Sequence, residues 1–244
     1  MPVRYFLLLL LLLLRYGAYA QFSDSVHYHA VANLAGNINT TDQGQNMVFN
    51  NSVRLEVRKK KFELNNNSSW IYGLQQKQLT NNDVNSTLDF NRYFQLPHFN
   101  YWGLGNYTSS YSLKIRNQYQ AGAGLAYNLI DKKKLTLKIS DGLLLESSDV
   151  LLSDTIRNQY STWRNSLRIT AKGTIAKICT INASGFWQPS LNNGFDYIIK
   201  TNIAASIKIK KWFSFTTAFV YNRFNLTGKE NTLFTYGITL EGFF

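Results

Sequence analysis

The segment YIIKTNIAASIKIK, residues 197–210, places apolar and polar side chains at alternate positions. Its apolar positions are Tyr197, Ile199, Ile203, Ala205, Ile207 and Ile209. Its polar positions are Lys200, Asn202, Ser206, Lys208 and Lys210. Because successive side chains of a β-strand point to opposite faces, this repeat of two predicts a strand with one apolar and one charged face.

The same alternation extends outward from this segment along most of residues 21–244. Met47–Arg58 and Phe234–Glu241 repeat it most clearly, again with charged residues on one side. Aromatic residues make up 15% of the chain and there are only three prolines, a composition that favours strands. The chain is therefore expected to be all-β.

The first twenty residues have the composition of a secretory signal peptide. Arg4 precedes the apolar run 5–14, and the small residues of Ala18-Tyr19-Ala20 provide a cleavage site before Gln21. An N-terminal membrane anchor is the alternative, but ten apolar residues span only about 15 Å as a helix, about half of a bilayer core. We therefore expect residues 1–20 to be removed on export and residues 21–244 to form one domain.

A transmembrane strand needs about ten residues, which divides the exported chain into about twelve strands. We expect their centres near residues 31, 53, 68, 88, 102, 123, 138, 166, 180, 203, 218 and 238. Short links at 58–61, 95–98, 131–134, 172–174 and 210–211 alternate with longer polar loops at 39–46, 75–83, 108–116, 146–160, 188–194 and 225–232. This asymmetry predicts a single up-and-down antiparallel transmembrane β-barrel in the outer membrane of a Gram-negative bacterium, with both termini on the periplasmic, short-turn side.

The polar faces of these strands supply the candidate lining of the barrel lumen. The charged candidates are Arg54, Glu56, Glu63, Asp89, Lys138, Arg164, Arg168, Lys200, Lys208 and Glu241. Barrels of eight strands are filled and those of sixteen enclose a channel, so about twelve strands leave both outcomes open. A narrow porin-like pore would prefer small anions weakly, whereas charges paired across strands would form a structural plug.

The short links are rich in Lys and Arg, and the C-terminal residues have a pattern that resembles a barrel-assembly signal. The periplasmic rim candidates are Arg58, Lys59, Lys60, Lys61, Lys132, Lys133, Lys134, Lys210 and Lys211, which either anchor the rim among lipid headgroups or keep the turns soluble. Tyr236, Ile238, Leu240 and the terminal Phe244 resemble the signal that the bacterial barrel-assembly machinery recognises. The expected partners are therefore outer-membrane lipids and this machinery, and the oligomeric state stays open.

The charge and the few reactive residues point to no cofactor and no catalytic centre. The net charge of +12 falls to +10 without Arg4 and Arg15, but its location in turns gives no reason to expect nucleic acid. Cys179 is the only cysteine, and His27 and His29 are interpreted as a solvated rim pair. We interpret four glycines as lumen-facing positions that allow the strands to bend: Gly103, Gly105, Gly122 and Gly124. An outer-membrane lipid-modifying or hydrolytic enzyme and a secreted glycan-binding β-protein remain alternatives.

Two adjoining segments resemble a known family. They are SLKIRNQYQAGAGLAY, residues 112–127, and LTLKISDGLLLE, residues 135–146. Their arginine-bearing strand, Gly-x-Gly strand ending in Tyr, and following strand ending in Glu resemble the salt-induced outer-membrane protein family, also known as domain of unknown function 481. The resemblance implies an outer-membrane barrel over most of residues 30–244 and implies no activity.

Overall fold

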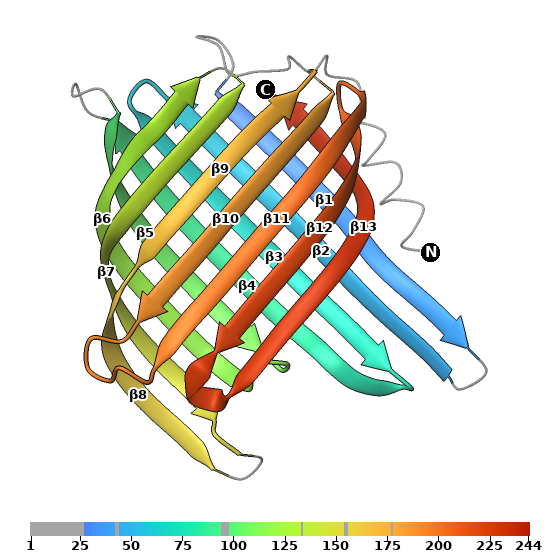
Figure 1. Ribbon diagram of the computed structural model, residues 1–244, viewed down its shortest axis with the longest axis vertical. Helices are drawn as coiled ribbons and strands as arrows, with labels where there is room; N and C mark the ends of the chain where they lie inside the picture. Colours follow the sequence, from blue (N-terminus) through green and yellow to red (C-terminus); the bar gives the residue numbers. More distant parts are fainter. Residues whose placement is uncertain (1–26, 42–43, 94–97, 133, 154–155, 177) are drawn as a thin grey trace.

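The computed structural model contains thirteen β-strands that form one sheet (Figure 1). It describes residues 27–41, 44–93, 98–132, 134–153, 156–176 and 178–244. The strands are β1 (Tyr28–Thr41), β2 (Gly44–Lys59), β3 (Phe62–Gln75), β4 (Gln78–Tyr93), β5 (Phe99–Ser110), β6 (Ile115–Lys132), β7 (Leu135–Leu151), β8 (Arg157–Asn165), β9 (Leu167–Ile175), β10 (Cys179–Pro189), β11 (Tyr197–Lys210), β12 (Phe213–Phe224) and β13 (Lys229–Phe243). The expected signal peptide lies outside the described residues.

Twelve of the strands close into an antiparallel barrel. Each pairs with its neighbours along the chain, and β1 pairs with β13 from His29 opposite Phe243 to Gly36 opposite Tyr236. The remaining strand, β8, extends β9 past a break at Ser166. Both pair with β7, β9 through Leu135–Ser140 and β8 through Leu143–Leu151. The predicted twelve-stranded barrel is thus confirmed, with one strand interrupted.

Eleven of the twelve predicted strand centres fall inside strands and the twelfth, residue 166, falls at the break between β8 and β9, but several predicted loops are wrong. Only Gln76 and Lys77 separate β3 from β4, although residues 75–83 were expected to be a loop. Residues 172–174 lie inside β9 and do not form a turn. Backbone pairing continues where the apolar alternation stops, because a hydrogen-bonded ladder requires no apolar side chain.

The apolar face of the strands points out of the barrel. Along β11, for example, Ile203, Ile207 and Ile209 are exposed, whereas Ile198 on the other face is buried. Large exposed apolar residues are present on every strand from β1 to β13. A continuous apolar outer surface of this kind is favourable in contact with lipid hydrocarbon and unfavourable in contact with water, as in outer-membrane barrels.

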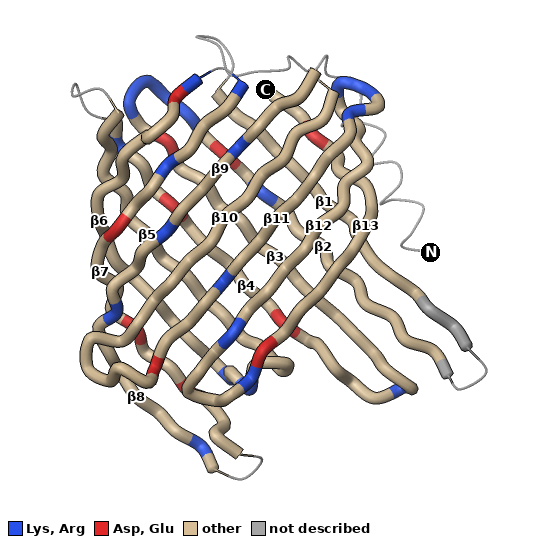
Figure 2. Tube along the Cα trace, viewed as in Figure 1, with Lys and Arg blue, Asp and Glu red and all other residues tan. Residues whose placement is uncertain are grey.

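The two described chain ends meet at one rim. The backbone N–H groups of His27 and Tyr28 donate to the carbonyl of Phe244 at 3.0 and 2.9 Å. The turns of this rim, from β2 to β3 and from β11 to β12 among others, carry Lys and Arg (Figure 2). At the opposite rim the β7–β8 hairpin projects beyond the barrel (Figure 1).

Candidate functional site in the barrel interior

A buried arginine holds β7, β8 and the β10–β11 connection together. Arg164 on β8 is fully buried and donates from Nε and Nη2 to the two carboxylate oxygens of Glu146 at 2.7 and 2.8 Å. Its Nη2 also donates to Asp196 Oδ2 at 2.7 Å. Burial raises the pKa of Asp196, which lies in the connection, and the Arg164 guanidinium opposes that rise. The network joins β8 to the β10–β11 connection where β8 and β10 share only an isolated bridge.

The side of the interior formed by β5, β6 and β7 is packed solid. Trp102 is buried with Ala126 and Leu144, and its indole Nε1 donates to the carbonyl of Leu125 at 3.2 Å. Side chains on Gly124 or Gly142 would lie 2.6 and 2.5 Å from the Trp102 ring. These glycines therefore make room for an aromatic ring that turns inward.

The glycine prediction is only half correct. Gly122 and Gly124 face the lumen, since a Cβ on each would meet the inward side chains of Leu144 and Trp102. Gly103 and Gly105 alternate with the inward Trp102 and Leu104, so they face outward. The expectation that these two face the lumen is wrong because the Gly-x-Gly spacing carries no information about which face it occupies.

One ion pair crosses from β9 to β4, strands that are not neighbours in the wall. Arg168 Nη1 donates to Asp89 Oδ1 at 3.3 Å. The Arg168 guanidinium carbon also lies over the ring of Phe186, 5.2 Å from the ring centroid. These contacts fill the interior between β4 and β10.

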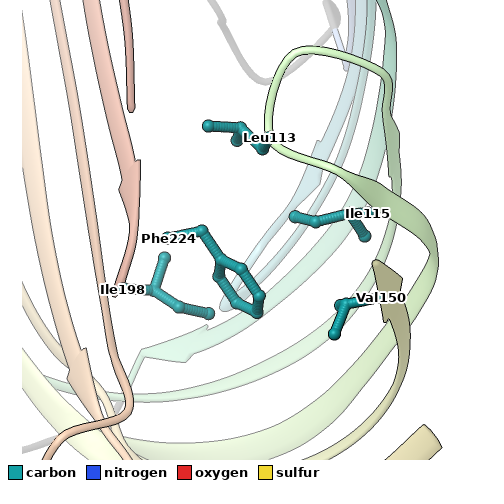
Figure 3. Close-up of a cluster of buried hydrophobic side chains, with 5 residues drawn as sticks. All are labelled: Leu113, Ile115, Val150, Ile198 and Phe224. Carbon is teal, nitrogen blue, oxygen red and sulfur yellow. The ribbon is translucent and has the colours of Figure 1, made fainter. Parts of the chain in front are cut away.

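The connection between β5 and β6 folds inward across the mouth at the rim opposite the termini. The inward connection contributes Leu113 to a buried apolar cluster (Figure 3). The other members of this cluster are Ile115 on β6, Val150 on β7, Ile198 on β11 and Phe224 on β12. The Thr227 hydroxyl, in the β12–β13 connection, donates to the Leu113 carbonyl at 3.0 Å. This mouth cluster joins opposite walls of the barrel.

Asp83 on β4 fixes the same connection. Its carboxylate accepts hydrogen bonds from the hydroxyls of Ser110 and Ser112 at 2.8 and 2.6 Å and from the backbone N–H of Ser112 at 3.0 Å. Asn231 on β13 donates to the Ser112 hydroxyl at 2.9 Å and to Asp83 at 3.3 Å. The inward fold of residues 111–114 is therefore held by polar bonds as well as by apolar packing.

A histidine lies between two carboxylates at the rim of the termini. His29 Nδ1 is 3.2 Å from Glu56 Oε2, and His29 Nε2 is 3.0 Å from Glu241 Oε1. The imidazole stacks on Phe243 with ring centroids 4.0 Å apart, and the residue is buried. The interpretation of His27 and His29 as a solvated pair is wrong for His29, which connects β1, β2 and β13.

The rest of the interior is open to water. Arg54 and Asn67 lie opposite each other on β2 and β3, and Lys172 lies opposite Asn182 on β9 and β10. All four are exposed although they face inward, on the same faces as Glu56 and Arg168. The interior therefore has packed contacts between β4 and β10, whereas inward side chains contact solvent on β2 and β3 and, nearer the rim of the termini than Arg168, at Lys172 and Asn182 on β9 and β10.

The ten predicted lining residues divide by their contacts. Glu56 and Glu241 bind His29, Glu63 lies 3.6 Å from Arg58, and Asp89, Arg168 and Arg164 take part in the pairs above. Within the described residues no ion pair is found for the inward-facing cations Arg54, Lys138, Lys172, Lys200 and Lys208. Sequence reasoning missed Glu146 and Asp83, because each stands at the end of an expected loop. It also missed Asp196, which lies between the expected loop 188–194 and the alternating segment 197–210.

The predicted rim residues lie where the strands turn. Arg58 and Lys59 end β2, Lys60 and Lys61 form the turn to β3, and Lys210 and Lys211 stand between β11 and β12. Lys132 ends β6 and Lys134 precedes β7, whereas Lys133 lies outside the described residues. The assembly-signal residues Tyr236, Ile238, Leu240 and Phe244 share the outward face of the last strand.

Two kinds of site are absent from the described part of the chain. No helix there is long and apolar enough to cross a membrane. No group of three or more His, Cys, Asp or Glu side chains is placed there to hold a metal ion.

Comparison with known families gives a match over most of the sequence. A family model described as a protein of unknown function, DUF481, matches residues 32–243. The chain belongs to the DUF481 family. The resemblance found in residues 112–127 and 135–146 is thereby confirmed, although the name of salt-induced proteins is not tested. No curated protein matches the sequence.

Solved structures similar to this DUF481 barrel are outer-membrane barrels. The NanC porin is 9% identical with a TM-score of 0.56, over 86% of this chain and 98% of its own. The translocator domain of the autotransporter NalP from Neisseria meningitidis is 10% identical with a TM-score of 0.52, over 90% and 89%. An outer-membrane channel from Pseudomonas putida F1 is 11% identical with a TM-score of 0.51, over 94% and 99%. At this identity the similarity shows the fold, that of an outer-membrane β-barrel.

Proposed function

We propose that this protein is a narrow, non-enzymatic outer-membrane channel with a weak preference for small anions. The observation that carries the proposal is the charge of the water-accessible interior. Arg54 and Lys172 face that space, are exposed and have no ion pair with a described residue. Fixed charges that line a narrow pore select ions of the opposite sign.

The inward acids do not balance these cations. Glu56 and Glu241 contact His29, Asp89 binds Arg168, and Glu146 binds Arg164. Lys200 and Lys208 on β11 add two more inward cations without such partners. The plug of paired charges and the anion pore are therefore compatible, because the exposed cations Arg54 and Lys172 belong to the part of the interior that the paired charges leave open to water.

The mouth cluster supports a small pore over a wide one. Val150 and Phe224 are 0% and 1% exposed, so no water passes between the walls that they join. Solutes would pass beside this cluster, along β1 to β3, where Asn67 and Arg54 are exposed. A catalytic role is not proposed, because the buried histidine His29 is engaged by two carboxylates.

The proposal is tested by the reversal potential of the refolded protein in planar bilayers under a KCl gradient. We expect a reversal potential of the sign produced by chloride, and we expect the double variant Arg54→Gln/Lys172→Gln to move it towards zero. The control Lys60→Gln/Lys211→Gln removes two charges from the rim turns and should leave it unchanged. Absence of any current, or cation selectivity in the unmodified protein, would overturn the proposal.

A further inference from the structure

The outward face of β4 to β7 carries a shallow apolar groove. On one rung of the sheet Phe90, Gly103, Ala123 and Leu143 lie side by side, and on the next rung Leu88, Gly105, Ala121 and Leu145 do so. Both rungs thus run large, small, small, large. A Cβ added to Gly105 would meet no atom within 4 Å, and one added to Gly103 would meet only a carbonyl at 3.9 Å. The two middle strands therefore leave open space between exposed leucine and phenylalanine walls.

A polar hollow of about 630 Å³ adjoins this groove towards the rim opposite the termini. Tyr119 and Ser147, which line it, are the next outward residues after Ala121 and Leu145. The full lining is Asn117, Tyr119, Ser147, Ser148, Asp149, Arg157, Gln159, Tyr160 and Ser161. Groove and hollow are continuous along β6 and β7, so they form one site with an apolar part and a polar part.

The charge of the hollow favours an anion. Arg157 donates from Nε and Nη2 to both oxygens of Asp149 at 2.7 Å each, which neutralises the one acid in the lining. Arg116 stands beside the hollow, next to the lining residue Asn117, and its Nε is 3.9 Å from Asp149 Oδ2. The two arginine side chains are 49% and 52% exposed, so guanidinium N–H groups remain accessible beside one net positive charge.

We propose that groove and hollow together bind one phosphorylated glycolipid of the leaflet at this rim, which we expect to be the outer leaflet. Arginine guanidinium groups suit phosphate oxygens, and the hydroxyl and amide groups of Ser147, Ser161 and Asn117 suit sugar hydroxyls. An acyl chain lying over Gly103, Gly105, Ala121 and Ala123 fills space that the wall leaves open. The geometry requires the head and the chain in one molecule, because the two parts are adjacent.

The occupant is distinguished by three probes bound to the detergent-solubilised full chain and measured by native mass spectrometry. They are a phosphorylated diglucosamine lipid with acyl chains, the same lipid without phosphate, and glucosamine 1-phosphate without a chain. We expect the first to bind about tenfold more tightly than either of the others, a factor that one charge-assisted contact typically provides. Equal binding of glucosamine 1-phosphate would overturn the proposal in favour of a free sugar phosphate.

Variants separate the site from unspecific lipid adhesion. Ala123→Leu fills the groove and should weaken binding of the phosphorylated lipid about tenfold, and Arg116→Gln should abolish the preference for the phosphorylated form. The control Ala183→Leu enlarges an outward small residue on β10, outside the groove, and should bind as the unmodified protein does. The shift in gel migration on boiling confirms that each variant is folded. Identical binding by Ala123→Leu and Ala183→Leu would contradict the proposal.

Discussion

At the scale of single residues, the interior charges show what alternation predicts and what it leaves out. The alternation correctly placed Arg54, Arg164 and Arg168 on the inward face of their strands. It could not pair them, because Arg168 meets Asp89 across 79 positions of sequence and across the lumen. Glu146 was taken for the start of a loop, although it is fully buried against Arg164.

The buried pair gives a stability prediction. Glu146→Gln leaves the Arg164 guanidinium buried with less negative charge, so we expect a loss of about 3–5 kcal/mol in the free energy of unfolding. The measurement is urea unfolding of the protein folded into lipid vesicles. The control Glu230→Gln breaks the exposed Arg223 pair, in which the side chains are 40% and 59% exposed, and should cost no more than about 1 kcal/mol. Equal losses for the two variants would contradict the prediction.

The inward glycines give a second residue-scale prediction. A Cβ on Gly124 would lie 2.1 Å from the Asp141 carbonyl oxygen and 2.6 Å from the Trp102 ring. Gly124→Ala must displace a backbone strand or the indole, which typically costs about 1–3 kcal/mol. Gly185→Ala is the control, because nothing lies within 4 Å of its added Cβ. Urea unfolding in lipid vesicles should therefore show a larger loss in the free energy of unfolding for Gly124→Ala than for Gly185→Ala. A smaller loss for Gly124→Ala would refute this account.

At the scale of elements, the sequence predicted the number of strands better than their ends. Hydrophobic alternation stops where the wall leaves hydrocarbon, as in residues 78–83, but β4 begins at Gln78. Beyond that level, backbone pairing with β3 continues through polar residues such as Asn81 and Asn82. The break between β8 and β9 at Ser166 was not predicted either, because no proline or glycine marks it in the sequence; it lies two residues after the buried Arg164.

The β3–β4 turn yields an element-scale prediction. Gln76 and Lys77 both have positive φ, 50° and 67°, in a two-residue hairpin loop. Such loops prefer Asn-Gly, since a left-handed conformation costs most other residues about 1–2 kcal/mol each. The double variant Gln76→Asn/Lys77→Gly should therefore be about 1–2 kcal/mol more stable in vesicle unfolding.

The opposite substitution, which removes a glycine from a position of positive φ, is Gly228→Ala in the β12–β13 connection. Its φ is 62° and no atom lies within 4 Å of an added Cβ, so the loss should come from the backbone conformation alone, about 1 kcal/mol. Destabilisation by the Asn-Gly turn, or stabilisation by Gly228→Ala, would show that these connections have another conformation in the folded barrel.

At the scale of the whole molecule, the even strand count predicted from the sequence allows the first and last strands to pair antiparallel, as β1 and β13 do, but the asymmetry of the interior does not follow from the sequence. Trp102, Arg168 and their neighbours fill part of the interior between β4 and β10, whereas exposed inward residues remain at Arg54 on β2 and at Lys172 on β9. A period of two assigns every residue to a face, yet it cannot tell which inward side chains meet across the lumen. A barrel of twelve strands can thus be partly plugged and still contain water.

The mouth cluster makes this division testable, because one carboxylate holds the inward connection. Asp83 accepts hydrogen bonds from Ser110, Ser112 and Asn231. In Asp83→Ala these donors lose their carboxylate acceptor, and the connection at residues 111–114 keeps fewer polar bonds, such as the one from Thr227 to the Leu113 carbonyl. We therefore expect larger and more variable single-channel currents in planar bilayers. Asp131→Ala is the control, since this exposed aspartate lies near the rim of the termini, away from the mouth. If the variant and the control carry the same current, the mouth cluster does not limit passage, and the constriction must lie deeper, where Arg168 meets Asp89.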